Sequence, residues 1–173
     1  MSFSMSQACL PALTIGLNAL SGVLDKAAAF AASRKFDPAM LLASRLAPDM
    51  FTLTRQVQVA CDQAKNGAAR LAGVEPPKFE DNETSIDALK ERIAKTVAFL
   101  ASLDSQAIDT AVEKEIIFPL GPAKGKMIGA DYLNHFVLPN FYFHLTAAYA
   151  IVRHCGVEVG KRDFLGAIPI TRF

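Results

Sequence analysis

Apolar residues recur along this chain at intervals of three and four, the spacing that places side chains on one face of an α-helix. The strongest runs predict four long helices, at about residues 5–32, 49–72, 85–100 and 130–155. Thr84 or Ser85 is suited to begin the third helix, and Gly73 and Gly156 to end the second and fourth. The pattern predicts an all-α fold, an up-down four-helix bundle, as a single domain over residues 1–173.

Shorter segments connect these helices. Asp37-Pro38 predicts a short extra helix that ends at Leu42, and Ala47-Pro48-Asp49 predicts the start of the second long helix. We expect a polar turn at residues 104–109 and an irregular tail at 157–173. β-Branched residues on both sides of a Pro/Gly-rich stretch at 119–125 predict a small β-hairpin before the last helix.

The last predicted helix is apolar on two faces. At about 100° per residue, one stripe contains Leu133, Val137, Asn140, His144, Ala148 and Ile151, and the other contains Leu138, Tyr142, Leu145, Tyr149 and Val152. One face would meet the other helices. The second would meet the hairpin, the C-terminal tail or another subunit, and we expect a homodimer.

Asn140 and His144 lie one helical turn apart on an otherwise apolar stripe. Because an unpaired polar side chain is costly to bury, both need partners, and this is the candidate site. Pro139 lacks a backbone donor, so we expect a kink near Asn140 and an unpaired carbonyl about one turn earlier, in the region of residues 131–135.

Composition excludes several classes of function. The chain has 18 basic and 17 acidic residues, for a net charge of +1, and no basic patch, so nucleic acid is not an expected partner. No uninterrupted apolar run predicts a membrane span, and the N-terminus does not resemble a signal peptide. Cys9, Cys61 and Cys155 lack the spacing of a disulfide or metal motif, which favours buried thiols in the cytoplasm.

Two stretches resemble a known family. Pro139-Asn-Phe-Tyr-Phe-His144, continuing to Gly166, and Arg45-Leu-Ala-Pro-Asp-Met-Phe51, with the segment that runs to Gly73, are similar to an uncharacterised branch of the DinB/YfiT-like superfamily. The resemblance implies a four-helix bundle that is often dimeric. It also implies a divalent metal held by three histidines in many members, one on the second helix and a His-x-x-x-His pair on the last. Thiol-dependent transferases and isomerases occur among them.

This chain departs from that histidine pattern. His144 matches one histidine of the last helix, but Asn140 and Ala148 occupy the positions four residues away. The second helix has no histidine, and its nearest substitutes are Gln58, Cys61 and Asp62. A three-histidine site is therefore excluded. A core histidine, a small-molecule site and a degenerate metal site remain open.

We therefore expect a cytoplasmic protein of unknown activity with a polar pocket that binds a small molecule. The residues assigned to this pocket are Asn140, His144, Gln58, Asp62 and Tyr149, with His144 as the catalytic candidate. No cofactor is expected, and a divalent metal at His144 is the alternative. The alternative functions are a metal- or thiol-dependent transferase or hydrolase-like enzyme, and a structural or stress-associated dimer with a relict site.

Overall fold

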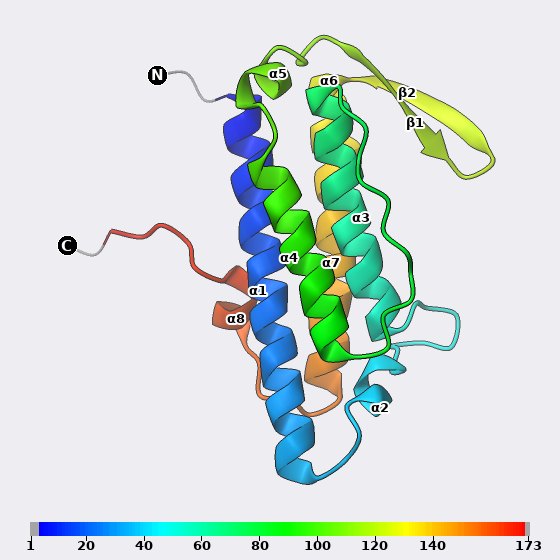
Figure 1. Cartoon of the computed structure of the whole chain (residues 1–173), viewed down its shortest axis with the longest axis vertical. Coiled ribbons are helices and arrows are strands. Elements are labelled where there is room, and N and C mark those ends of the chain that lie inside the picture. The colour runs from blue at the N-terminus through cyan, green and yellow to red at the C-terminus, as the bar shows by residue number, and fades with distance from the viewer. Residues whose placement is uncertain (1–3, 172–173) are drawn as a thin grey trace.

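The computed structural model describes residues 4–171 and contains four long helices packed side by side (Figure 1). They are α1 (Met5–Arg34), α3 (Leu53–Ala72), α4 (Ile86–Ala101) and α7 (Leu138–His154). The short helices are α2 (Ala39–Leu42), α5 (Ser105–Asp109), α6 (Gly129–Asp131) and α8 (Lys161–Leu165), and a π-helical segment, η1 (Tyr132–Val137), precedes α7. The strands β1 (Glu115–Leu120) and β2 (Ala123–Ile128) complete the chain. The predicted helical bundle, extra helix and hairpin are confirmed.

The direction of the helices differs from a simple up-down alternation. Gln56 of α3 meets His144 of α7, while Gly67, later in α3, lies against Val137, which precedes α7, so these two helices are antiparallel. In contrast, α3 and α4 run in the same direction (Figure 1). Residues 74–84, which we call the strap, return along α3 before α4 begins (Figure 1). An extended chain of this length spans about 36 Å, enough to pass a helix of 20 residues, and Pro76-Pro77 keeps the strap from becoming helical.

Side-chain caps set the helix ends. Ser85 begins α4 as predicted, and its hydroxyl accepts a hydrogen bond from the Ala88 N–H. The predicted start of α3 at Asp49 is wrong, because Thr52 is the residue whose hydroxyl caps that helix. Residues 43–52 are therefore a loop, which leaves Phe51 outside the helix. Gly73 ends α3 with a φ of 72°, a left-handed conformation that glycine adopts without strain.

Two segments predicted to be irregular contain a helical turn. Asp104 accepts a hydrogen bond from the Gln106 N–H and starts α5 within the expected turn. In the tail, the Asp163 carboxylate accepts one from the Gly160 N–H at 2.8 Å and stabilises the start of α8. Both helices are five residues long. Helices this short depend on their caps rather than on a periodic apolar pattern, which is why the pattern does not reveal them.

The last helix accommodates Pro139 by widening. The Leu138 N–H bonds the Leu133 carbonyl, five residues back, in the π-helical turn before the proline. The Asn140 side chain donates to the Phe136 carbonyl at 2.7 Å. The chain thus forms a wide turn before the proline, and Asn140 supplies a partner to the Phe136 carbonyl, one residue beyond the region where we expect an unpaired carbonyl. Such turns often occur next to functional sites.

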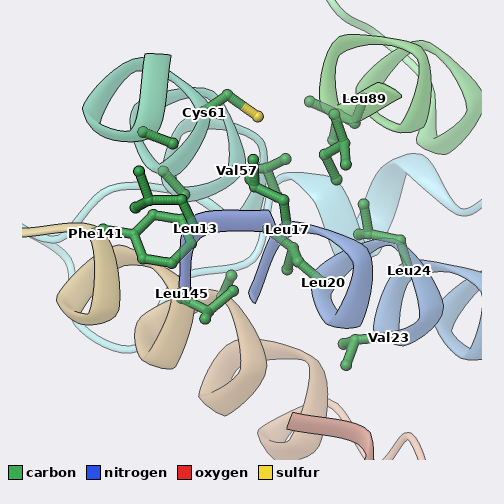
Figure 2. Close-up of a cluster of buried hydrophobic side chains, with 14 of the residues drawn as sticks. Leu13, Leu17, Leu20, Val23, Leu24, Val57, Cys61, Leu89, Phe141 and Leu145 are labelled. Atoms are coloured by element: carbon green, nitrogen blue, oxygen red, sulfur yellow. The ribbon is translucent and has the colours of Figure 1, made fainter. Parts of the chain in front are cut away.

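The core lies between the four long helices. Figure 2 shows Leu13, Leu17, Leu20 and Leu24 of α1 meeting side chains of α3, α4 and α7. By length and composition α1 could cross a membrane, but it is also the central helix of this core, so that is weak evidence for a span. The second face of α7 is covered within the chain in part, since Leu145 and Val152 are buried and Tyr149 packs edge-on against Phe164 of α8.

Gly67 lets α3 pack tightly against Val137 of the last helical segment. A Cβ atom there would lie 2.5 Å from a methyl group of Val137, a β-branched side chain that cannot easily rotate away. We expect Gly67→Ala to lower the free energy of unfolding by about 1–3 kcal/mol through overpacking. Urea denaturation measures this change.

Gly22→Ala is the matched control, because Gly22 is also inside a long helix but has open space around its Cβ position. It should leave stability unchanged or raise it by up to about 1 kcal/mol, through helix propensity alone. Equal effects of the two substitutions would show that close packing at Gly67 is not what limits this position.

Candidate functional site

His144 of α7 is buried against α3, where Gln56 is its hydrogen-bond partner. The side-chain distance from His144 Nδ1 to Gln56 Oε1 is 2.7 Å, and the two residues are 8% and 1% exposed. An amide oxygen only accepts hydrogen bonds, so the imidazole proton belongs on Nδ1 and Nε2 has a lone pair. Neither His144 Nε2 nor Gln56 Nε2 has a hydrogen-bond partner among residues 4–171.

Neither of these two nitrogen atoms is completely enclosed. Among the described residues, the one fully enclosed side-chain nitrogen or oxygen atom without a partner is Arg92 Nε, so solvent reaches His144 Nε2 and Gln56 Nε2. The pair therefore offers an acceptor and a donor to a small molecule. Because His144 Nε2 points away from the side of the ring that bonds Gln56, a ligand would need its donor and its acceptor on separate groups.

Two exposed aromatic side chains flank the imidazole. The Phe51 ring stacks on it with centroids 6.3 Å apart, and the Phe143 ring meets it edge-on at 5.1 Å. Phe51 is 49% exposed and Phe143 is 58% exposed, so the imidazole lies just beneath an aromatic surface. The Arg55 guanidinium lies over the Phe51 ring, 5.8 Å from its centroid.

These surroundings favour neutral histidine. Burial lowers the pKa of His144 below its ordinary value, and the positive charge of Arg55 lowers it further. Among the described residues no carboxylate forms an ion pair with this ring. The Gln56–His144 pair is therefore uncharged at neutral pH.

The structure brings together few of the residues that the sequence assigned to the site. Asn140 is half-buried and bonds the backbone of its own helix rather than His144. The Tyr149 hydroxyl donates to the Val159 carbonyl at 3.4 Å, on the side of the C-terminal tail. Gln58 and Asp62 contact the strap and α4.

Gln56 is the partner that sequence reasoning missed. It lies three residues after Leu53 and four before Ala60, and so on the buried stripe of α3. The signal was present, since a glutamine on an apolar stripe needs a buried partner just as His144 does. The sequence alone could not show that Gln56 and His144, on two different helices, pair with each other.

Gln58 and Asp62 belong to a second polar group, the Arg92 cluster, which consists of Gln58, Asp62, Asp81, Glu83 and Arg92. The Arg92 guanidinium is buried and lies 2.9 Å from Asp62, 3.0 Å from Asp81 and 2.9 Å from Glu83. Gln58 donates to Glu83 at 2.8 Å. This cluster fastens the strap to α3 and α4.

Charge in the Arg92 cluster is nearly balanced. Burial alone would raise the pKa of Glu83, but hydrogen bonds from Arg92 and Gln58 outweigh burial and hold that pKa below its ordinary value. Lys65 adds a cation 3.6 Å from Asp62 and donates to the Pro77 carbonyl at 2.7 Å. Each charged group has at least one partner within the protein, with Arg92 Nε alone left without one, so we interpret the cluster as structural.

The side chains near His144 do not fit the three-histidine metal site of many DinB-like proteins. Among residues 4–171, no group of three or more His, Cys, Asp and Glu side chains is arranged to hold a metal ion. His144 contributes one imidazole, Gln56 contributes a neutral amide, and no carboxylate completes the set. We derive no metal-dependent step from this arrangement.

The buried cysteines are poorly suited to nucleophilic chemistry. Burial raises the pKa of Cys9 and of Cys61 to about 12, so both remain thiols at neutral pH. Cys155 is half-buried, and all three are free of disulfide bonds.

Comparisons with known proteins agree with this fold. The family model for a domain of unknown function, DUF1993, matches residues 5–165. The chain belongs to the DUF1993 family. Its structure is similar to the crystal structure of a DinB family member protein from Shewanella denitrificans, with 41% sequence identity and a TM-score of 0.90. The match covers 96% of this chain and 94% of that one.

These matches confirm the predicted resemblance to an uncharacterised DinB-like domain. No curated protein matches the chain. Membership of DUF1993 therefore establishes the fold and the family, and the chemistry has to be argued from the residues.

The neutral His144 makes a prediction about pH. Its pKa lies below 6.5 in the folded protein, so between that value and 6.5 the unfolded chain binds more protons, and stability falls as the pH is lowered through this range. We expect His144→Gln to reduce that fall. Urea unfolding of the two proteins from pH 7.5 to pH 5 measures the difference.

His135→Gln is the control, since His135 is exposed and lies beside Asp131 on the surface. Its stability should fall with decreasing pH as much as that of the unmodified protein. If His144→Gln and the unmodified protein show the same pH dependence, His144 is not held neutral by its surroundings.

Proposed function

We propose that this DUF1993 protein binds a small neutral molecule at the Gln56–His144 pair. The observation that carries the proposal is the combination of a buried, uncharged polar pair with two nitrogen atoms that lack protein partners. A ligand would donate an N–H to His144 Nε2, and a separate acceptor group on the ligand would accept from Gln56 Nε2. This arrangement uses polar groups that nothing else in the described structure satisfies.

An apolar groove that includes Phe143, the neighbour of the His144 ring, supports a ligand with an apolar body, although His144 and Gln56 are not part of its lining. The groove has a volume of about 460 Å³ and lies between the 43–52 loop and α7. Its lining consists of Leu46, Met50, Tyr142, Phe143, Thr146, Ala147 and Ala150. Phe143 borders the groove and touches the His144 ring, so it links the apolar surface to the polar pair. Small-molecule sites typically combine an apolar cavity with a few polar groups in this way.

Catalysis would have to use the same atom. Since Nδ1 carries the proton, Nε2 is the ring nitrogen of His144 that has a lone pair. A transferase or hydrolase-like activity would use this atom as a general base. Binding is the simpler proposal, because no acidic side chain within residues 4–171 orients the imidazole.

A homodimer is the second candidate, as predicted from the sequence. Support comes from the exposed apolar side chains around the groove, among them Leu46 at 42%, Tyr142 at 40% and Phe143 at 58% exposure. A second copy on this face would also enclose the apolar part of a ligand. The cytoplasmic location belongs to the same proposal and is supported by the three free cysteines.

Binding can be tested with aryl lactams and carboxamides against matched lactones and esters, which lack the N–H donor. We expect the amides to bind more tightly by about tenfold, because the ester leaves His144 Nε2 without a partner. Titration calorimetry or NMR shifts would measure the affinities. His144→Phe should remove the preference for amides.

Asn140→Ala is the matched control and should keep the amide preference, since Asn140 bonds the Phe136 carbonyl rather than the pair. A preference that persists in folded His144→Phe, or the absence of binding by every amide, would contradict the proposed function.

The dimer can be tested by light scattering. We expect a mass near twice the chain mass of 18.6 kDa, and a monomer for Ala150→Glu, which places a charge in the groove. Ala98→Glu on the exposed surface of α4 is the control and should remain dimeric. A monomeric unmodified protein would remove this candidate.

A further inference from the structure

We propose that Arg55 and Asp81 form a latch that holds Phe51 over His144, so that the strap controls access to the Gln56–His144 pair. The proposal rests on the proposed function for its biological meaning. Its structural content, the coupling of Asp81 to the exposure of His144, can be tested without any ligand.

Phe51 is the part of the latch that would move. It lies in the loop before α3 rather than in the helix, since Thr52 is the capping residue. Nearly half of its side chain is exposed, yet its ring stacks on the imidazole of His144. A loop residue that stacks on the face of a largely buried ring can move off that face through a local backbone movement, without disrupting the bundle.

Arg55 links Phe51 to the strap. In the first turn of α3, its guanidinium lies over the Phe51 ring, 5.8 Å from the ring centroid. The same guanidinium forms an ion pair with Asp81 of the strap and donates to Gln58 Oε1 at 3.2 Å. The imidazole, the Phe51 ring, the Arg55 guanidinium and the Asp81 carboxylate therefore form a continuous series of contacts.

The two ion pairs that Asp81 forms differ in strength. Arg92 holds the other oxygen of Asp81 at 3.0 Å from a buried position, which fixes the carboxylate. The Arg55–Asp81 pair has side chains 39% and 41% exposed, so salt screens it and it stabilises the closed arrangement only weakly. A latch with one fixed end and one weak, exposed contact is suited to open without unfolding of the strap.

The rate at which diethyl pyrocarbonate modifies the neutral imidazole of His144, followed by peptide mass spectrometry, reports how often this ring is uncovered. Asp81→Asn should raise the rate about two- to fivefold, the range that the loss of an exposed ion pair supports. Arg55→Gln should do the same while leaving Arg92–Asp81 in place. Phe51→Ala defines the fully uncovered rate.

Salt provides an independent measurement. In the unmodified protein the rate should rise with ionic strength, and in Asp81→Asn this dependence should largely disappear. Asp25→Asn, which removes the surface ion pair with Lys90, is the matched control and should leave the rate at His144 unchanged. Circular dichroism and thermal melting confirm that each variant is folded.

Unchanged rates in folded Asp81→Asn and Arg55→Gln would overturn the latch, and so would an unchanged rate in Phe51→Ala. These outcomes are separate from those of the proposed function. If the rates change but no amide binds, the latch holds and the proposed function fails. If amides bind equally well to all variants and the rates do not change, the proposed function holds and the latch fails.

Discussion

The packing of α3 against the last helix is the constraint on which the site depends. At one end of this contact Gly67 lets the backbone approach Val137, and at the other Gln56 reaches His144. A larger residue at position 67 would push the helices apart, and a hydrogen bond of 2.7 Å tolerates little separation. The apolar contact therefore sets the geometry of the polar one.

The second polar group on α3 shows how neighbouring residues of one helix serve different purposes. Gln56 and Gln58 are two positions apart, which places them on different sides of the helix. Gln56 faces α7, while Gln58 faces the strap and α4. Arg55 touches both environments, which explains how a charge in a structural cluster can influence a neutral site without entering it.

Much of the fold could be predicted from the sequence because it depends on local signals. The apolar periodicity, Ser85 and Gly73 placed the long helices, and the Pro/Gly-rich stretch placed the hairpin. The parallel direction of α3 and α4 could not be predicted, since the path of the strap depends on the contacts of Arg92 of α4 with carboxylates of α3 and of the strap. His144 and Asn140 were both identified for the same local reason, as polar residues on an apolar stripe. The bond from Asn140 to the Phe136 carbonyl could not be foreseen, because it forms beside the wide turn.

That wide turn has a consequence for how the family can vary. Its hydrogen bonds close over one residue more than those of an α-helix, so the turn accommodates what amounts to a one-residue insertion in the last helix. Such an insertion changes the rotational phase between the segment that carries Tyr132, packed on the hairpin, and the segment that carries His144. The wide turn therefore sets the rotation about the helix axis between the residues packed on the hairpin and His144. A relative with a regular α-helix here would hold the same two groups at a different angle.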